Sequence, residues 1–152
     1  MIIRKIDTFI KLSKRQKIIF AWIIILSIYR NILFLCRSPK AHAHYFDKIK
    51  KIDPRPTDEQ KQLALDINKA IRLAVKYIPW KNVCRHQAWQ AVYLLNYYNI
   101  PYEHQVGFKK DESNKTLGHS WVISCGFFIT GECEIQEYKI IQMRKNIIIA
   151  DN

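Results

Sequence analysis

The period of the apolar residues changes at Pro101, and this change limits the folds that the 152-residue chain can adopt. Before Pro101, apolar residues recur at helical spacing over residues 57–78 and 84–98. After it, four short apolar runs indicate strands, at residues 102–108, 120–124, 127–130 and 138–143. This order predicts one α+β domain in which N-terminal helices precede a small antiparallel sheet, with the helix that begins near residue 84 packed on the sheet.

Two helix starts are marked by a capping-box pattern. Ser13 stands three residues before Gln16, and Thr57 stands three residues before Gln60. In this pattern the hydroxyl and the amide side chain each satisfy a backbone N–H group of the first turn. The helix that follows Thr57 stops before Pro79, because proline cannot continue a helix.

The apolar segment at residues 18–36 is nearly long enough to span a membrane. Residues 18–29 carry no charge, but Arg30 and Asn31 interrupt the run. A central arginine costs about 2.5 to 3.5 kcal/mol on insertion scales, and a bilayer span needs roughly 20 apolar residues. We therefore expect the helix to pack on the domain or to lie on a surface rather than to span a membrane, so that residues 18–36 could still associate with a membrane in a protein that its cysteine usage, described below, places in the cytoplasm.

The positive charge of the chain is concentrated at its N-terminus. Residues 1–51 hold twelve Lys and Arg against two Asp, which gives ten of the net twelve positive charges. Such a segment suits an acidic partner or an anionic membrane surface, or is simply a solvated face, and no nucleic-acid motif accompanies it. We divide the chain into a basic, apolar segment at 1–56 and a core at 57–152.

The cysteines at positions 36, 84, 125 and 133 show no C-x-x-C spacing, which argues against a disulfide framework or a zinc site. His42 and His44 form an isolated His-x-His pair with no second pair nearby. We therefore expect a reducing compartment, no metal and no cofactor.

One thiol and one imidazole stand in contexts that suit a nucleophile and its base. Cys84 falls in the expected first turn of a helix, where free N–H groups and the positive end of the dipole favour a thiolate and can hold an oxyanion. His119 falls at the start of a run of strand character. A helix-borne Cys with a strand-borne His is the arrangement of papain-like and transglutaminase-like cysteine proteases.

Six short motifs in order resemble the stand-alone leader peptidase of lasso-peptide biosynthesis. They are Pro79-Trp80, Cys84 with Gln87-Ala88, Asn99-Ile100-Pro101, Val106-Gly107-Phe108-Lys109-Lys110, Gly118-His119-Ser120-Trp121-Val122 and Thr130-Gly131. That family usually has an apolar N-terminal helix, a Trp before its Cys, a "GIP" turn, a "GVRKD"-like strand and an "HAWV" motif. The resemblance covers residues 13–143.

The resemblance implies a transglutaminase-like cysteine-protease fold and removal of the leader from a ribosomally made precursor (RiPP maturation). It also implies three partners: the precursor leader, a small leader-recognition protein and a macrolactam-forming synthetase. Two other functions remain open. One is an acyltransferase of the same fold, in which an amine replaces water, and the other is a non-catalytic module that binds a leader or a membrane.

The third member of the triad is assigned from the strand register. In well-matched relatives an acidic residue lies about twelve positions after the histidine, where this chain has Gly131. If residues 125–126 form a two-residue hairpin turn, strand alternation places His119 opposite Glu132, with Thr130 diagonal on the same face. Glu132 is therefore the predicted orienting acid, with Thr130 or no third member as alternatives.

Two further residues are candidates for substrate binding. Gln87 lies one helical turn after Cys84 on about the same face, and Trp121 shares a strand face with His119. Each is expected to line the cleft, although each serves equally well in core packing.

Overall fold

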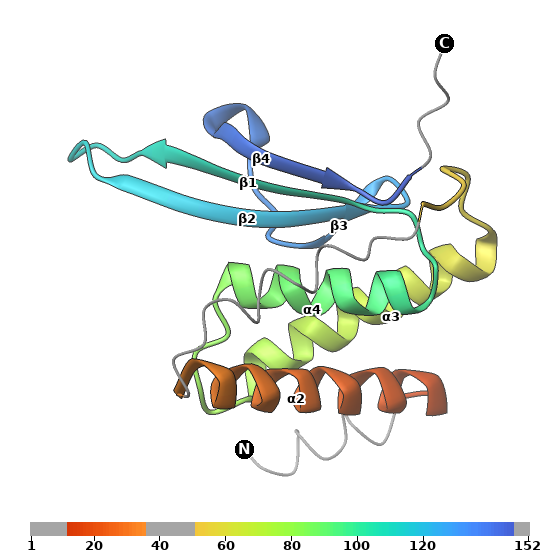
Figure 1. Ribbon diagram of the computed structural model, residues 1–152. Coiled ribbons are helices and arrows are strands. Elements are labelled where there is room, and N and C mark those ends of the chain that lie inside the picture. Colours follow the sequence, from red (N-terminus) through yellow and green to blue (C-terminus); the bar gives the residue numbers. More distant parts are fainter. Residues whose placement is uncertain (1–11, 36–50, 148–152) are drawn as a thin grey trace.

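The computed structural model describes residues 12–35 and 51–147. Three long helices precede four strands, so the predicted α+β order is confirmed (Figure 1). The elements are α2 (Lys14–Leu35), α3 (Asp58–Tyr77), α4 (Cys84–Tyr97), β1 (Glu103–Lys110), β2 (Thr116–Ser124), β3 (Phe127–Thr130), the short 3₁₀ helix η3 (Ile135–Glu137) and β4 (Lys139–Lys145).

The strands form one antiparallel sheet in the order β3-β2-β1-β4. The helices cover one face of this sheet, with α4 against β2 and β3, and α3 against β3. In Figure 1 the sheet is one layer, α3 and α4 form the next, and α2 lies farthest from the sheet. The connection from β3 to β4, which includes η3, passes over the opposite face of the sheet.

Both predicted capping boxes are confirmed. The backbone N–H of Gln16 donates to Ser13 Oγ at 3.2 Å, and the N–H of Ser13 donates to Gln16 Oε1 at 3.1 Å. The same reciprocal pair joins Thr57 and Gln60 at the start of α3. Each box satisfies two N–H groups that a helix start would otherwise leave without a partner.

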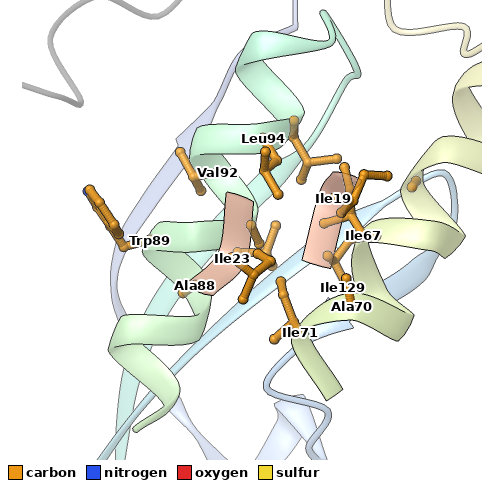
Figure 2. Packing of buried hydrophobic residues seen from close by; sticks show 14 of the residues in the cluster. Ile19, Ile23, Ile67, Ala70, Ile71, Ala88, Trp89, Val92, Leu94 and Ile129 are labelled. Carbon is orange, nitrogen blue, oxygen red and sulfur yellow. The ribbon is translucent and has the colours of Figure 1, made fainter. Parts of the chain in front are cut away.

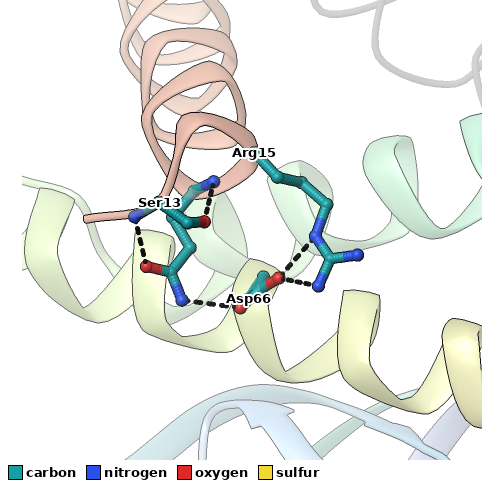
Figure 3. A network of polar contacts seen from close by, with 4 residues as sticks. Ser13, Arg15 and Asp66 are labelled. Carbon is teal, nitrogen blue, oxygen red and sulfur yellow. Dashed lines mark hydrogen bonds and ion pairs between the residues drawn. The ribbon is translucent and has the colours of Figure 1, made fainter.

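A buried carboxylate fixes the start of α2 on α3 (Figure 3). Asp66, only 1% exposed, accepts a hydrogen bond from Arg15 Nε at 2.8 Å and one from Gln16 Nε2 at 2.8 Å. Both oxygens are therefore bonded, which a buried carboxylate requires. Because Gln16 also belongs to the capping box, the same side chain both starts α2 and docks it.

One hydrophobic core joins all three helices to the sheet (Figure 2). Helix α2 contributes Ile19, Ile23 and Leu26, which are almost completely buried. Their partners from the other elements include Ile67, Ile71, Ala88, Val92, Leu94, Val122 and Ile129. Helix α2 is thus packed on the domain, and no helix in the described ranges has both the length and the apolar character needed to cross a membrane.

Arg30, which interrupts the apolar run of α2, is buried. Its guanidinium lies over the ring of Trp89 in α4, 5.8 Å from the ring centroid. Burial, and the neighbouring Arg85, lower the pKa of Arg30 to about 10. The charge of Arg30, which makes a membrane span unfavourable, therefore lies among the helices, against an aromatic ring of α4.

The β2–β3 hairpin turns at Cys125 and Gly126, as predicted, and both residues have positive φ, at 54° and 85°. Positive φ at both central positions is typical of the tight hairpin turn whose twist matches a sheet. Two details differ from expectation. Strand β2 begins at Thr116 rather than at residue 120, and a bulge between Val122 and Ile123 shifts the pairing with β3.

The buried histidine His104 gives the fold a testable dependence on pH. It is 7% exposed, its Nε2 lies 2.9 Å from Ser120 Oγ, and burial, with a smaller effect of Arg144, lowers its pKa to about 4. The unfolded chain then binds more protons than the folded chain between about pH 6.5 and pH 4. The contribution of neutral His104 to the free energy of unfolding is therefore complete above pH 6.5, and it falls as the pH decreases from 6.5 to 4.

We expect wild type to lose up to about 3 kcal/mol of unfolding free energy from this group alone between pH 7.5 and pH 4. His104→Gln, which does not titrate, should lose less over the same interval. Urea unfolding of both proteins at several pH values measures the difference. Equal pH slopes would show that burial of His104 does not govern its protonation.

Candidate active site

Cys84 is the first residue of α4, at a helix start that no side chain caps. The preceding residue, Val83, is the N-cap and makes no side-chain cap bond. Among the described residues, the N–H groups of Cys84 and Arg85 have no hydrogen-bond partner, whereas α3 begins with a complete capping box. Two free donors and the positive end of the dipole therefore lie at a half-buried, free thiol.

His119 lies inside β2, with its ring held by two aromatic neighbours. The ring stacks on Trp121 at a centroid distance of 5.9 Å and lies tilted against Tyr138 at 5.5 Å. Its Nε2 lies 3.0 Å from the backbone carbonyl oxygen of Gly131. Because a carbonyl can only accept, this contact is a hydrogen bond when the neutral ring carries its proton on Nε2, which leaves Nδ1 to accept a proton.

Gln87 connects the start of α4 to the end of β3. Its Nε2 donates to the Asn82 carbonyl at 2.6 Å, and its Oε1 accepts from Thr130 Oγ1 at 3.1 Å. Thr130 directly precedes Gly131, whose carbonyl accepts from the His119 ring. The helix turn that carries Cys84 and the strand that carries His119 are therefore joined through residues 130–131.

Cys84 and His119 themselves are not hydrogen-bonded in the part of the chain that the structure describes. On β2, Val122 belongs to the core on the helical side, so strand alternation points His119 and Trp121 to the other face. Strand β3 pairs with β2 only as far as Val122, which leaves residues 118–121 without a strand partner on that edge. Because α4 and Cys84 lie on the helical side, the thiol and the imidazole can meet only at this open edge of β2. Catalytic hydrogen bonds often form only when substrate is bound.

A sequence profile described as the transglutaminase-like superfamily matches residues 33–143, which include Cys84, His119 and Gly131. The chain belongs to this superfamily. The transglutaminase-like superfamily includes cysteine peptidases and acyltransferases, and its fold agrees with the three helices and antiparallel sheet. No curated protein and no solved structure matches the chain significantly.

The register predicted for Glu132 in this transglutaminase-like domain is wrong. Because of the bulge, Thr130 pairs with Val122 rather than lying opposite Trp121, and β3 ends at Thr130. Glu132 therefore does not pair with His119. Its side chain is exposed and makes no hydrogen bond or ion pair within the described residues. It lines an open pocket of about 520 Å³ formed with Phe128 and residues 133–136.

Two groups beside His119 were not predicted from the sequence. The first is the Gly131 carbonyl, for which the signal was present: Gly131 stands twelve positions after His119, where an acid is expected. The second is Tyr138, which covers the His119 ring and had no sequence signal. Trp121, a predicted substrate-binding residue, is 0% exposed and lies against His119 and Tyr138. Its contacts support the histidine from within the domain.

The described residues contain no group of three or more side chains that could hold a metal ion. The His42 and His44 pair lies outside the described residues, as does Cys36. Cys125 and Cys133 are free thiols, and burial raises the pKa of Cys133.

The bond between Gln87 and Thr130 can be measured by a double-mutant cycle. We expect Gln87→Leu and Thr130→Val to show a coupling of about 1 kcal/mol in urea unfolding, because an intramolecular hydrogen bond contributes about that much. A control cycle pairs Thr130→Val with Gln62→Leu, since Gln62 is exposed on α3, and should show no coupling. Coupling near zero in the first cycle would mean that Gln87 does not connect α4 to β3.

Proposed function

We propose that this transglutaminase-like protein is a cysteine peptidase that removes the leader from a lasso-peptide precursor. The observation that carries the proposal is the uncapped start of α4 at Cys84, joined through Gln87 and residues 130–131 to His119. A thiol at free helix N–H groups and an imidazole with a defined basic nitrogen are the two groups that nucleophilic acyl chemistry needs.

In the reaction we propose, Cys84 Sγ attacks the scissile carbonyl carbon while His119 Nδ1 accepts the thiol proton. The N–H groups of Cys84 and Arg85 donate to the oxyanion. His119 then gives the proton to the leaving amine as the C–N bond breaks, which leaves a thioester on Cys84. Water, deprotonated by His119, attacks the thioester and releases the acid and the free thiol.

The choice of leader removal over other peptide chemistry rests on the resemblance of six ordered motifs between Pro79 and Gly131 to lasso leader peptidases. The partners would be the precursor leader, a small leader-recognition protein and the macrolactam synthetase. The steps above need no cofactor. In the alternative, acyl transfer, an amine takes the place of water at the thioester, so the products distinguish the two reactions.

An exposed apolar stripe on α2 favours a docking surface for the leader-recognition protein. The α2 stripe consists of Ile18, Ala21, Ile25, Ile28, Tyr29 and Ile32, which share one side of the helix. Its large members are 44 to 56% exposed, which is unusual for so many apolar side chains together. Lys14 lies on the same side by helical period, and its charge suits an acidic partner.

The nucleophile and base are tested by Cys84→Ala and His119→Ala. We expect each change to reduce leader removal by at least about 1,000-fold, because a nucleophile and its base act as a unit. Purified variants are incubated with precursor and recognition protein, and the products are followed by mass. Circular dichroism checks that the variants are folded.

Glu132→Gln is the matched control, because Glu132 is exposed and makes no bond to His119. It should retain most of the activity. Cleavage by Cys84→Ala at the wild-type rate would rule out the peptidase. A crosslinked product formed in place of the hydrolysed leader would instead identify an acyltransferase.

The docking surface is tested by Ile25→Glu in the α2 stripe. We expect the KM for precursor in the presence of the recognition protein to rise about tenfold or more, with no change in the reaction of Cys84 with iodoacetamide. Val75→Glu, at an exposed apolar position of α3, is the control and should leave both unchanged. A point substitution is preferable to deletion of the helix, since α2 contributes Ile19 and Ile23 to the core.

Unchanged precursor processing by Ile25→Glu would contradict docking at the α2 stripe. If that variant instead loses binding to vesicles containing anionic phosphatidylglycerol while processing is normal, the stripe contacts a membrane surface.

A further inference from the structure

We infer that the backbone carbonyl of Gly131 positions the His119 imidazole, in the role that an acidic side chain has in a Cys-His-acid triad. This inference rests on the proposed cysteine chemistry and makes Gly131 a positioning residue. The carbonyl oxygen is 3.0 Å from His119 Nε2, within hydrogen-bond distance. Gly131 stands twelve positions after His119, the position where an acid is expected.

A carbonyl performs one part of the acid's task. In triads the third group holds the imidazole in one tautomer and one orientation, and it also stabilises the imidazolium electrostatically. A carbonyl has no proton to donate, so it can bind only the protonated ring nitrogen and thereby selects the Nε2–H tautomer. The ring plane is then held by Trp121 and Tyr138, at interplanar angles of 27° and 33°.

The backbone reaches His119 because residue 131 is glycine. Its φ is 71°, in the left-handed region that favours glycine. A Cβ atom built at this position would lie 2.4 Å from the Ser120 carbonyl oxygen and 2.9 Å from Trp121 Cα, both of which are backbone atoms of β2. Any other residue would have to move the chain away from β2 and, with it, the carbonyl from His119.

The approach of Gly131 to β2 is set by the two residues before it. The bulge places Ile129 as an extra residue, so that Thr130 pairs with Val122. Thr130 is buried and donates to Gln87 on α4. The chain therefore leaves β3 at a fixed position and crosses β2 beside His119. The same geometry leaves Glu132 exposed and beyond the β2–β3 pairing, so strand register does not place it opposite His119.

The first test measures the tautomer in the unaltered protein. We expect long-range ¹H–¹⁵N correlation spectra of the full chain, labelled with ¹⁵N-histidine, to show the neutral His119 ring protonated on Nε2. The His119→Ala spectrum assigns the signals among the five histidines. Protonation on Nδ1 would overturn the inference. This measurement does not require an active enzyme or a variant that folds well.

The second test compares two glycines with positive φ. Gly126 has φ of 85°, and a Cβ there would meet nothing within 4 Å, so Gly126→Ala carries a similar backbone strain without a clash. We expect Gly131→Ala to lose the fixed Nε2–H tautomer and to lower kcat on the order of 100-fold, because a small misplacement of a catalytic group has that effect. Gly126→Ala should retain both.

Wild-type tautomer and kcat in folded Gly131→Ala would overturn the inference, as would equal loss in the two glycine variants. These outcomes are separate from those that test the proposed function. If Cys84→Ala cleaves precursor at the wild-type rate, the peptidase assignment fails, although the spectra can still show the Gly131 carbonyl holding the ring. If the spectra show Nδ1–H while Cys84→Ala is inactive, the peptidase stands and the positioning role of Gly131 fails.

Discussion

Burial of α4 between the other helices and the sheet is the interaction on which the site depends. Half of the residues of this 14-residue helix are buried, namely Ala88, Trp89, Gln90, Ala91, Val92, Leu94 and Leu95. Complete burial of a leucine stabilises a protein by about 1.5 to 3 kcal/mol, whereas an N-cap contributes about 1 kcal/mol. Two leucines therefore more than offset the missing cap at Val83. Packing holds α4 in place, so its first N–H groups can remain available at Cys84.

The helices and their order could be predicted from the sequence because local signals determine them. Ser13 and Thr57 cap their helices through residues only three positions away, and Pro79 ends α3 by its own covalent structure. The turn at residues 125–126 is local in the same way. These features depend on neighbours in the sequence, and tertiary packing did not change them.

The bulge in β2 and β3 could not be predicted, and because of it the register predicted for Glu132 was wrong. Strand alternation has a period of two, so one extra residue exchanges the faces of everything that follows. The shift is fixed by tertiary contacts, namely the Thr130 bond to Gln87 and the fit of Gly131 against β2. Neither contact leaves a periodic pattern in the sequence. The sequence also did not show which side of α2 is buried, because isoleucines lie on both the core side and the solvent side of this helix.

Several polar groups of the candidate site belong to the backbone, so a comparison of side chains between sequences does not detect them. The thiol of Cys84 and the imidazole of His119 are visible in the sequence, but the proposed oxyanion donors and the acceptor at His119 Nε2 belong to the main chain. A substitution at residue 132 can therefore leave the histidine unchanged, while one methyl group at residue 131 meets two backbone atoms of β2.

A missing acid does not by itself mean that a transglutaminase-like domain has lost its triad, because a glycine that brings a carbonyl to the same nitrogen can fix the same tautomer. A carbonyl does not supply the negative charge that an acid places beside an imidazolium, so at this position the main chain can fix the tautomer and the orientation of the ring, which also lies against Trp121 and Tyr138.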